Sequence, residues 1–590
     1  MHFEKYIKPL IIWRLKHIPD QHFILILSAV IGLTSGLAAV VIKNSVHFIQ
    51  ELIKNEIFNF GNYLYIAYPV IGIFFAVLFI KFIIRRKVNH GIPAVLYSIS
   101  KENGIMKQHN MFSSIITSAF TVGFGGSVGL EGPTVATGAS IGSNIGRLFR
   151  MSYKTKILLI GCASAGAMSA IFKAPITGII FAIEVIMLDL TMSSLVPLLI
   201  ASSIAALTSY FFLGRDVLFH FTLQDEFLFN DIPFFVILGI FTGLISTHFT
   251  RMYMKIRSYF ERINKWQVKI LVGGIALGIL IFILPPLYGE GYETINSLLK
   301  GDYKSVMENS MFSEFQDNMY VVFGFLILLI FLKVVATSIT FGAGGIGGIF
   351  APTLFMGSTL GFTFAKILQY FGIKDLSVSN FALVGMAGTI AGVLFAPLTA
   401  IFLIAEITGG YQLFVPLMIT AAVSYTTIRL FESNSVYTIQ LAKRGELLTH
   451  HKDKTILKLI KVNDVVETNF ITVRPNDTLG YLVNVIKKSV RNIFPVIDEK
   501  GNYLGLIPLD NIRNIMFDQG KYDKIFVKDL MIDPHISVTT EDGLDIVMAK
   551  FRSSGHWNLP VVDKGKYLGF VSRANIFNSY RKMLVEFSED

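Results

Sequence analysis

Apolar runs long enough to cross a lipid bilayer recur between about Phe23 and Leu430. Roughly 20 consecutive apolar residues suffice for one crossing. Two such runs are YIAYPVIGIFFAVLFIKFII and MYVVFGFLILLIFLKVVATSI. Other apolar segments, such as SAGAMSAIFKAPITG, are shorter and broken by Gly or Pro. The pattern predicts an α-helical polytopic membrane protein in which some helices enter the bilayer without crossing it cleanly.

The pattern changes at about Arg444, where the polar segment RGELLTHHKDKT begins. Beyond this segment charged residues become frequent and long apolar runs stop. We therefore expect a membrane domain over residues 1–445, a linker over 446–461 and a soluble domain over the remainder.

The soluble domain repeats internally. FPVIDEKGNYLGLI at 494–507 is matched by LPVVDKGKYLGFV at 559–571, and each copy has two β-rich runs around a glycine turn, followed by a helical segment. Both copies keep their order and spacing, which is typical of a repeated module. They resemble a tandem pair of α+β CBS (cystathionine-β-synthase-type) modules, CBS 1 over 462–520 and CBS 2 over 527–585.

The membrane domain also repeats. APITGIIFAIE at 174–184 aligns with APLTAIFLIAE at 396–406, and GLEGPT at 129–134 aligns with GIFAPT at 348–353. The alternative is that Gly- and Ala-rich membrane helices resemble one another by composition alone. Because both pairs are offset by nearly the same distance, we favour one duplication. Duplicated halves with broken helices are how many transporters build a binding site near the bilayer midplane.

Composition and charge agree with this interpretation. Hydrophobic residues make up 53% of the 590 residues and charged residues only 16%, against about 25% charged residues in soluble domains. Basic clusters near the N-terminus and around Arg85 flank apolar runs, so the net charge of +11 indicates cytoplasmic membrane edges rather than nucleic-acid binding. We find no metal-ligand cluster, nucleophile motif or phosphate-binding loop, so neither an enzyme nor a metal site is expected.

Four short stretches occur in a characteristic order: NHGIPAV at 89–95, GSVGLEGPTV at 126–135, GGIGGIFAPTLF at 344–355 and SVYTIQL at 435–441. In this order they resemble the signatures of the CLC family of chloride channels and proton/chloride exchangers. The resemblance runs from about residue 20 to residue 445, and a C-terminal CBS pair is common in that family.

The resemblance implies a fold and a function. We expect a CLC-type inverted repeat of about 18 membrane helices, with halves over about 20–215 and 230–440. The protein should be a homodimer in the cell membrane, each subunit with its own pore for chloride or another small monovalent anion. The N-terminus and the CBS pair should be cytoplasmic.

Glycine allows close backbone approach to a ligand, and proline in a first turn starts a helix whose free N–H groups attract anions. Several such helix starts would bind chloride weakly enough to release it. The resemblance assigns the anion site to nine residues. They are His90, Gly91, Ile92, Gly129, Gly132, Ile349, Phe350, Ala351 and Tyr437.

Glu131 is a lone carboxylate in the second of these stretches. When ionised it can occupy the anion position, and when protonated or displaced it vacates that position. By resemblance Glu131 is the gating glutamate, and in exchangers also the external proton acceptor. The alternative is a carboxylate that only caps its own helix. An acid within the membrane is by default a functional-site hypothesis.

Two positions depart from the family pattern. His90 replaces a serine whose hydroxyl helps to coordinate the anion, and we hypothesise that the imidazole donates instead; alternatively, its ring points away. Val185 stands where exchangers usually carry a second acid, the inner proton acceptor. Glu184 and its repeat partner Glu406 are expected to form packing or polar contacts.

Val185 favours channel-type conduction, with a proton/chloride antiporter as the alternative, because some exchangers manage without the inner acid. From another class, the protein could be a non-conducting membrane sensor linked to its CBS pair. Tyr437 resembles the pore tyrosine of the family, although an interfacial anchor is the other interpretation. Because the fluoride-exporting branch alters this tyrosine, chloride is the better choice over fluoride.

The CBS pair could bind an adenine nucleotide. Nucleotide-binding members usually have Ser or Thr followed three residues later by an Asp that binds the ribose. Here the corresponding pairs are Pro508 with Asn511 and Ser572 with Asn575. Asn is a weaker partner for a diol than a carboxylate, so dimer packing and modulation of the membrane domain are the default roles.

Overall fold

The computed structural model describes residues 9, 12–60, 64–85, 91–186, 192–214, 228–373, 376–444, 460–532 and 536–588. The chain divides into two compact units, Met1–Leu447 and Leu448–Asp590.

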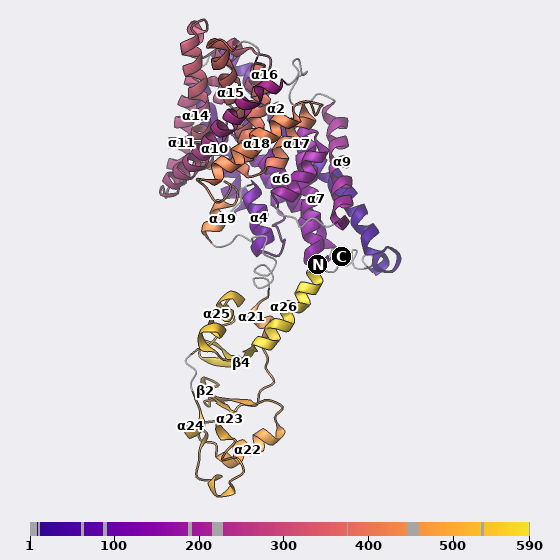
Figure 1. Ribbon diagram of the computed structural model, residues 1–590, viewed down its shortest axis with the longest axis vertical. Helices are drawn as coiled ribbons and strands as arrows, with labels where there is room; N and C mark the ends of the chain where they lie inside the picture. The colour runs from indigo at the N-terminus through magenta and orange to yellow at the C-terminus, as the bar shows by residue number, and fades with distance from the viewer. Residues whose placement is uncertain are drawn as a thin grey trace. The chain divides into compact units, whose positions relative to one another are not determined.

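The first unit is helical throughout its described part (Figure 1). Its first half contains α2 (Asp20–Phe60), α3 (Leu64–Leu78), the π-helical turn η1 (Phe79–Ile84), α4 (Gly91–Lys101), α5 (Asn110–Gly123), α6 (Glu131–Leu148), α7 (Tyr153–Phe172), α8 (Pro175–Glu184) and α9 (Met192–Leu213). Its second half contains η2 (Phe229–Asp231), α10 (Ile232–Glu261), α11 (Trp266–Ile283), η3 (Pro285–Leu287), α12 (Tyr292–Leu299), α13 (Tyr303–Met307), η4 (Ser313–Phe315), α14 (Met319–Ala343), α15 (Phe350–Tyr370), α16 (Val378–Leu394), α17 (Pro397–Ile407), α18 (Phe414–Arg429) and α19 (Ile439–Lys443).

Seven helices of the described residues are long and apolar enough to cross a membrane. They are α2, α3 with η1, α7, α9, α10 with η2, α11 and α14. Four shorter apolar helices, α8, α16, α17 and α18, accompany them. The predicted mixture of long spans and short membrane helices is confirmed.

The breaks between helices have the same cause in both halves. Lys173 ends α7 and Phe395 ends α16, each in the left-handed conformation with φ of 57° and 58°. Two residues later α8 and α17 begin, each with a proline at its first position. Because proline has no backbone N–H, it starts a helix well and cannot continue the preceding one.

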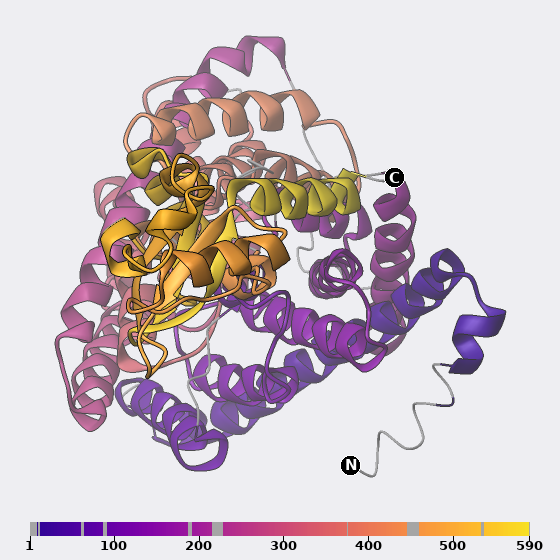
Figure 2. The same cartoon turned by 90° about the horizontal axis from the view of Figure 1, so that it is seen from below.

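The two halves also pack alike. In the first half α2 packs against α7 and α9, and in the second half α10 packs against α16 and α18. The pair α6 and α7 corresponds to the pair α15 and α16. Figure 2 shows the indigo and purple helices of the first half and the rose and orange helices of the second half in different parts of the view. The internal duplication read from the sequence therefore extends to the packing.

The second unit contains two similar modules. The first has α21 (Val462–Val465), α22 (Leu479–Lys488), β1 (Ile493–Ile497), β2 (Tyr503–Pro508), α23 (Leu509–Ile512) and η5 (Gln519–Lys521). The second has α24 (Val527–Leu530), α25 (Leu544–Ser554), β3 (Asn558–Asp563), β4 (Lys566–Ser572) and α26 (Arg573–Ser588). The predicted strands and turns are confirmed: β1 pairs with β2 and β3 with β4, both antiparallel, through turns at Gly501 and Gly565 with positive φ.

The two modules exchange chain segments. Glu467, which precedes the first module's hairpin, pairs with Phe570 on β4 of the second module. Ile532, which precedes the second hairpin, pairs with Leu506 on β2 of the first module. Ile460 and Val465 correspondingly belong to the hydrophobic core of the second module. Each module is therefore completed by the chain that leads into the other.

Candidate functional site

Two helix starts in the membrane unit are joined by their backbones. Gly129 N–H donates to the Gly348 carbonyl at 2.8 Å, and Gly348 N–H donates to the Gly129 carbonyl at 2.7 Å. Two residues later α6 begins at Glu131 and α15 begins at Phe350. A Cβ atom at Gly348 would lie 2.8 Å from the Gly132 nitrogen, so glycine is required for this approach. The positive ends of α6 and α15 thus meet at one buried point.

The carboxylate of Glu131 lies at this point and is fully buried. Its Oε2 is so close to Gly129 that a Cβ there would lie 2.1 Å away, and a Cβ at Gly348 would lie 3.3 Å away. The carboxylate is also near the amide groups of Glu131 itself and of Ala351. A carboxylate here occupies the position that amide groups at helix N-termini would offer to an anion.

A third helix start lies beside the first two. Gly91 begins α4 with φ of +57°, which favours glycine, and a Cβ at this residue would lie 3.8 Å from Gly132. Ile92 follows and is 1% exposed. The starts of α4, α6 and α15 therefore cluster around Gly132. His90, the residue before α4, lies outside the described residues, so the prediction for its side chain stays a prediction.

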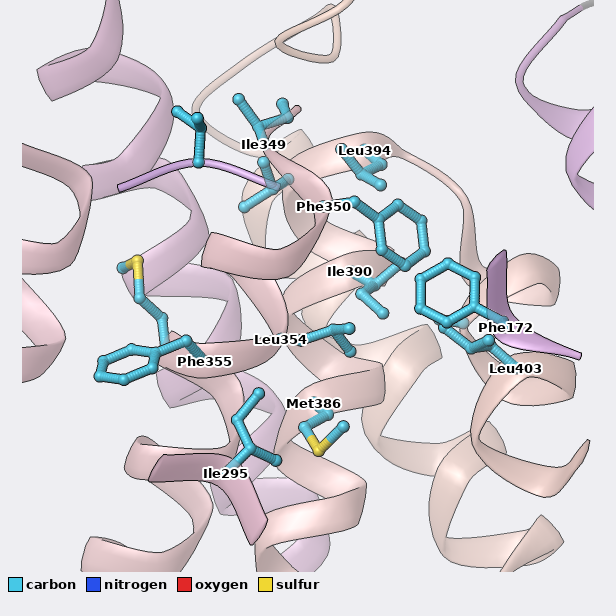
Figure 3. Close-up of a cluster of buried hydrophobic side chains, with 14 of the residues drawn as sticks. Phe172, Ile295, Ile349, Phe350, Leu354, Phe355, Met386, Ile390, Leu394 and Leu403 are labelled. Carbon is cyan, nitrogen blue, oxygen red and sulfur yellow. The ribbon is translucent and has the colours of Figure 1, made fainter. Parts of the chain in front are cut away.

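Phe350 and Tyr437 provide aromatic groups near this cluster. The Phe350 ring is fully buried, and its centroid lies 5.2 Å from that of Phe172 at the end of α7 (Figure 3). The buried Tyr437 hydroxyl has no hydrogen-bond partner among the described residues. This hydroxyl is within electrostatic range of Glu131. A buried hydroxyl without a partner is compatible with the predicted anion contact, which stays a prediction.

Ile349 precedes α15 and is 3% exposed, and Ala351 is fully buried in the first turn. Of the nine predicted anion-site residues, the structure places eight at or around the three helix starts. The eight are Gly91, Ile92, Gly129, Gly132, Ile349, Phe350, Ala351 and Tyr437. Their contact with an anion stays a prediction.

Sequence reasoning missed a group of polar side chains around Glu131. Tyr292 Oη donates to Glu131 Oε1 at 2.5 Å, and Glu290 Oε1 accepts from the Leu130 N–H at 3.3 Å. Lys43 and Lys333 are within electrostatic range of Glu290. One signal was present in the sequence, because Lys333 interrupts the apolar run FLILLIFLKVVATSI. Its partners could not be read from the sequence.

Val185 lies just after α8 and is 6% exposed. Its neighbour Glu184 accepts from Leu398 N–H at 3.0 Å and from Thr399 N–H at 2.7 Å. The Thr399 hydroxyl also donates to Glu184, at 2.7 Å. The acid next to Val185 is therefore engaged at the start of α17.

Glu406 makes the same contacts in reverse. It accepts from Ile176 N–H at 2.9 Å, from Thr177 N–H at 2.7 Å and from the Thr177 hydroxyl at 2.6 Å. Each of the two glutamates lies in the last turn of one helix and caps the start of the other. The expected polar role of Glu184 and Glu406 is confirmed.

The candidate nucleotide residues of the CBS pair are already engaged. Ser572 Oγ donates to Glu467 at 2.6 Å, and Asn575 Nδ2 donates to the Val465 carbonyl at 2.9 Å. Asn511 lies exposed on α23. The side chains of Ser572 and Asn575 thus already have partners within the CBS pair, and Glu467 is itself paired with Arg491 at 2.6 Å. Nucleotide binding at this pair stays a prediction. Among the described residues no group of His, Cys, Asp and Glu could hold a metal ion.

The family model described as voltage gated chloride channel matches residues 72–429, and the CBS domain model matches residues 462–518 and 527–582. The chain belongs to the voltage-gated chloride channel (CLC) family. It is therefore a membrane protein of a family of transport proteins rather than enzymes, and the CBS domains of this family normally lie in the cytoplasm.

Similar proteins differ in what their names state. A putative chloride channel protein ClcB-like of Ralstonia nicotianae is 27% identical over 64% of this chain and 85% of its own length. The H(+)/Cl(-) exchange transporter ClcA of Klebsiella pneumoniae is 27% identical over 67% of this chain and 84% of its own length. The crystal structure of a eukaryotic CLC transporter has the same fold, with a TM-score of 0.59 at 19% identity over 94% of this chain and 99% of its own.

Proposed function

We propose that the protein transports chloride across the membrane through the cluster of helix starts, with Glu131 as the gate. The observation that carries this proposal is the position of the Glu131 carboxylate at the paired starts of α6 and α15. A chloride ion at the same point would meet the same amide groups. The ionised carboxylate and the anion therefore compete, and protonation removes the competitor.

The neighbouring residues suit a weak anion site. Amide groups and the Tyr437 hydroxyl carry partial charges only, so an anion held by them can leave again. Phe350 and Phe172 supply apolar surface next to the site. This surface excludes water, so the attraction between the partial charges and an anion is stronger. We propose chloride as the anion because the named relatives transport it.

We favour channel-type conduction over proton-coupled exchange. Val185 has no proton to exchange, and the adjacent Glu184 is bound by three donors of α17. Proton/chloride antiport is the second candidate, supported by the relatives named exchangers. The non-conducting sensor has less support, because Glu131 and the helix starts are all in place.

Two further parts of the proposal concern assembly and regulation. We propose a homodimer with one pore in each subunit. The CBS pair would modulate transport, and nucleotide binding there would first require Glu467 to release Ser572. In titrations with ATP, we expect no saturable binding to the full-length protein.

The deciding experiment measures proton and chloride movement together. Purified protein is reconstituted in liposomes with a chloride gradient and no pH gradient, and both ions are followed. We expect chloride flux without uphill proton movement. Stoichiometric uphill proton movement would establish the antiporter instead, and absence of any chloride flux would refute transport. The variant Glu308→Gln changes an exposed residue after α13 and should give the same chloride and proton movement as the wild type.

A further inference from the structure

A second carboxylate lies beside the gate. Glu290 sits in the short loop between η3 and α12, flanked by Gly289 with φ of +56° and Gly291 with φ of +88°. Such angles favour glycine strongly. A Cβ at Gly291 would also lie 2.5 Å from the Phe355 ring. The backbone conformation on both sides of Glu290 therefore requires glycine.

This loop contacts the gate at two places. Glu290 Oε1 accepts from the N–H of Leu130, the residue directly before Glu131, at 3.3 Å. Tyr292, two residues further on, donates to Glu131 Oε1 at 2.5 Å. Glu290 in the loop and Tyr292 at the start of α12 thus hold both the backbone that precedes the gating carboxylate and the carboxylate itself.

The charges around the two carboxylates come from separate helices. Lys333 on α14 is fully buried and donates to the Gly289 carbonyl at 3.0 Å. Lys43 on α2 donates to the Ile171 carbonyl at 2.6 Å, and Lys173 lies within its electrostatic range. Both Lys43 and Lys333 interact electrostatically with Glu290, and so does Glu131. Glu290 therefore faces one like charge on α6 and opposite charges on α2 and α14, together with the Tyr292 hydroxyl on α12.

We propose that Glu290 is a positioning residue that sets the pH at which Glu131 leaves the anion position. This inference rests on the proposed function of Glu131 as the gate. Two ionised carboxylates that interact in a buried site disfavour one another, so their protons come off as those of a coupled pair. A negative charge on Glu290 favours the protonated, open form of Glu131.

The sign of the effect follows from this repulsion. E290Q keeps the size of the side chain and an oxygen that can accept from Leu130, but it removes the like charge. Glu131 then holds its proton less tightly, and the gate opens only at lower pH. We expect the pH of half-maximal chloride flux to fall by about one unit. K333M removes a positive charge that favours the ionised form of Glu290. Glu290 is then neutral over more of the pH range, so this variant should also move the midpoint downward.

The test measures chloride efflux from liposomes for the wild type, E290Q, E290D and K333M across about pH 4.5 to 9.5. This window includes the pH values at which Glu290 is ionised. E290D retains the charge and should return the midpoint toward the wild-type value. E293Q is the matched control, because Glu293 is exposed in the first turn of α12. We expect E293Q to superimpose on the wild type.

The outcomes separate the two proposals. If wild-type flux is absent, or if E131Q leaves its pH dependence unchanged, the gate itself is refuted. If E131Q abolishes the pH dependence while E290Q and the wild type share one midpoint, the role of Glu290 is refuted. Should E290Q fail to reconstitute, K333M decides, because an unmoved midpoint in that variant contradicts the coupling. In the double variant E131Q/E290Q the flux should be as independent of pH as in E131Q.

Discussion

The starts of α6 and α15 have the same backbone and different side chains. Leu130 before α6 has φ −94° and ψ −13°, and Ile349 before α15 has φ −96° and ψ −3°. Gly129 and Gly348 exchange two hydrogen bonds between the two halves. Yet the next residue is Glu131 in one half and Phe350 in the other. The duplication provides two equivalent anion-attracting ends, and only one of them carries an acid.

The ends of α8 and α17, in contrast, have the same side chain in both halves. There both halves keep a glutamate, and Glu184 and Glu406 make matching contacts with the start of the other helix. The two halves match where the contact joins helices, and they differ at the position that we propose as the gate. Comparing the two halves therefore separates residues that hold the fold from residues that operate it.

The largest effect should come from removing the acid that distinguishes the halves. In E131Q the side chain cannot ionise, so chloride flux should lose its dependence on pH. Wild-type flux should change by up to about tenfold per pH unit on the alkaline side of its midpoint, since each unit changes the ratio of protonated to ionised carboxylate tenfold. Liposome efflux assays measure both. F350L serves as control and should retain the wild-type pH dependence.

The next effect should come from disturbing the shared backbone. In G348A the new Cβ would lie 2.8 Å from the Gly132 nitrogen, which forces the helix starts apart. We expect a loss of about 1–3 kcal/mol in stability together with a strong loss of flux. Thermal unfolding in detergent and efflux assays test this. G324A is the control, because a Cβ at that residue meets nothing within 4 Å; equal behaviour of both variants would contradict the close approach.

A smaller and symmetric effect is expected at the reciprocal caps. E184Q and E406Q each keep one acceptor oxygen and lose the charge that strengthens these hydrogen bonds. Each should lower stability by about 1–2 kcal/mol, and the two losses should agree closely. Thermal unfolding compares them with E308Q, an exposed change that should cost less than about 0.5 kcal/mol. A large loss in only one of the two variants would show that the caps are not equivalent.

The smallest effect extends the comparison to the CBS repeats. Asp542 accepts from Thr539 N–H at 3.0 Å and from Lys550 at 2.7 Å, whereas the equivalent Asp477 has Val485 in place of that lysine. Burial raises the pKa of Asp542, but the hydrogen bonds from Lys550 and Thr539 outweigh it and hold the pKa below its ordinary value.

The ionised Asp542 therefore stabilises the fold above its unfolded pKa of about 3.9, and this contribution is lost as pH falls through the lower folded pKa. We expect D542N to cost less than about 1 kcal/mol at pH 7, because the ion pair is partly exposed. The difference from the wild type should vanish in strong acid. Urea unfolding of the full chain followed by Trp557 fluorescence measures it, and a difference that grows toward low pH would contradict the assignment.

The repeats and the helix starts could be predicted from the sequence, because both depend on short local motifs. APITGIIFAIE and APLTAIFLIAE share the Ala-Pro start that places the breaks before α8 and α17. GLEGPT marked Glu131 as an acid at a helix start, and the helix begins at this residue.

The surroundings of the gate could not be predicted in the same way. Tyr292 reaches Glu131 from 161 residues away, and Glu290 reaches Leu130 from 160 residues away. Neither Glu290 nor Tyr292 lies in a repeated motif, and the sequence GEGYET around them predicts only a glycine-rich turn. Only the packing of α12 against α15 brings this loop to the gate. The engagement of Ser572 by Glu467 is equally distant in sequence, because it depends on the exchange between the CBS modules.

That exchange sets a rule for dissecting the protein. Ile460 and Val465, which lie near the start of the described part of the second unit, belong to the hydrophobic core of the second CBS module rather than the first. A shortened chain that stops after the first CBS module would leave these apolar side chains without neighbours. In that chain β2 would also lose its partner Ile532. The cytoplasmic portion therefore behaves as one inseparable body, and deletions within it remove both copies at once.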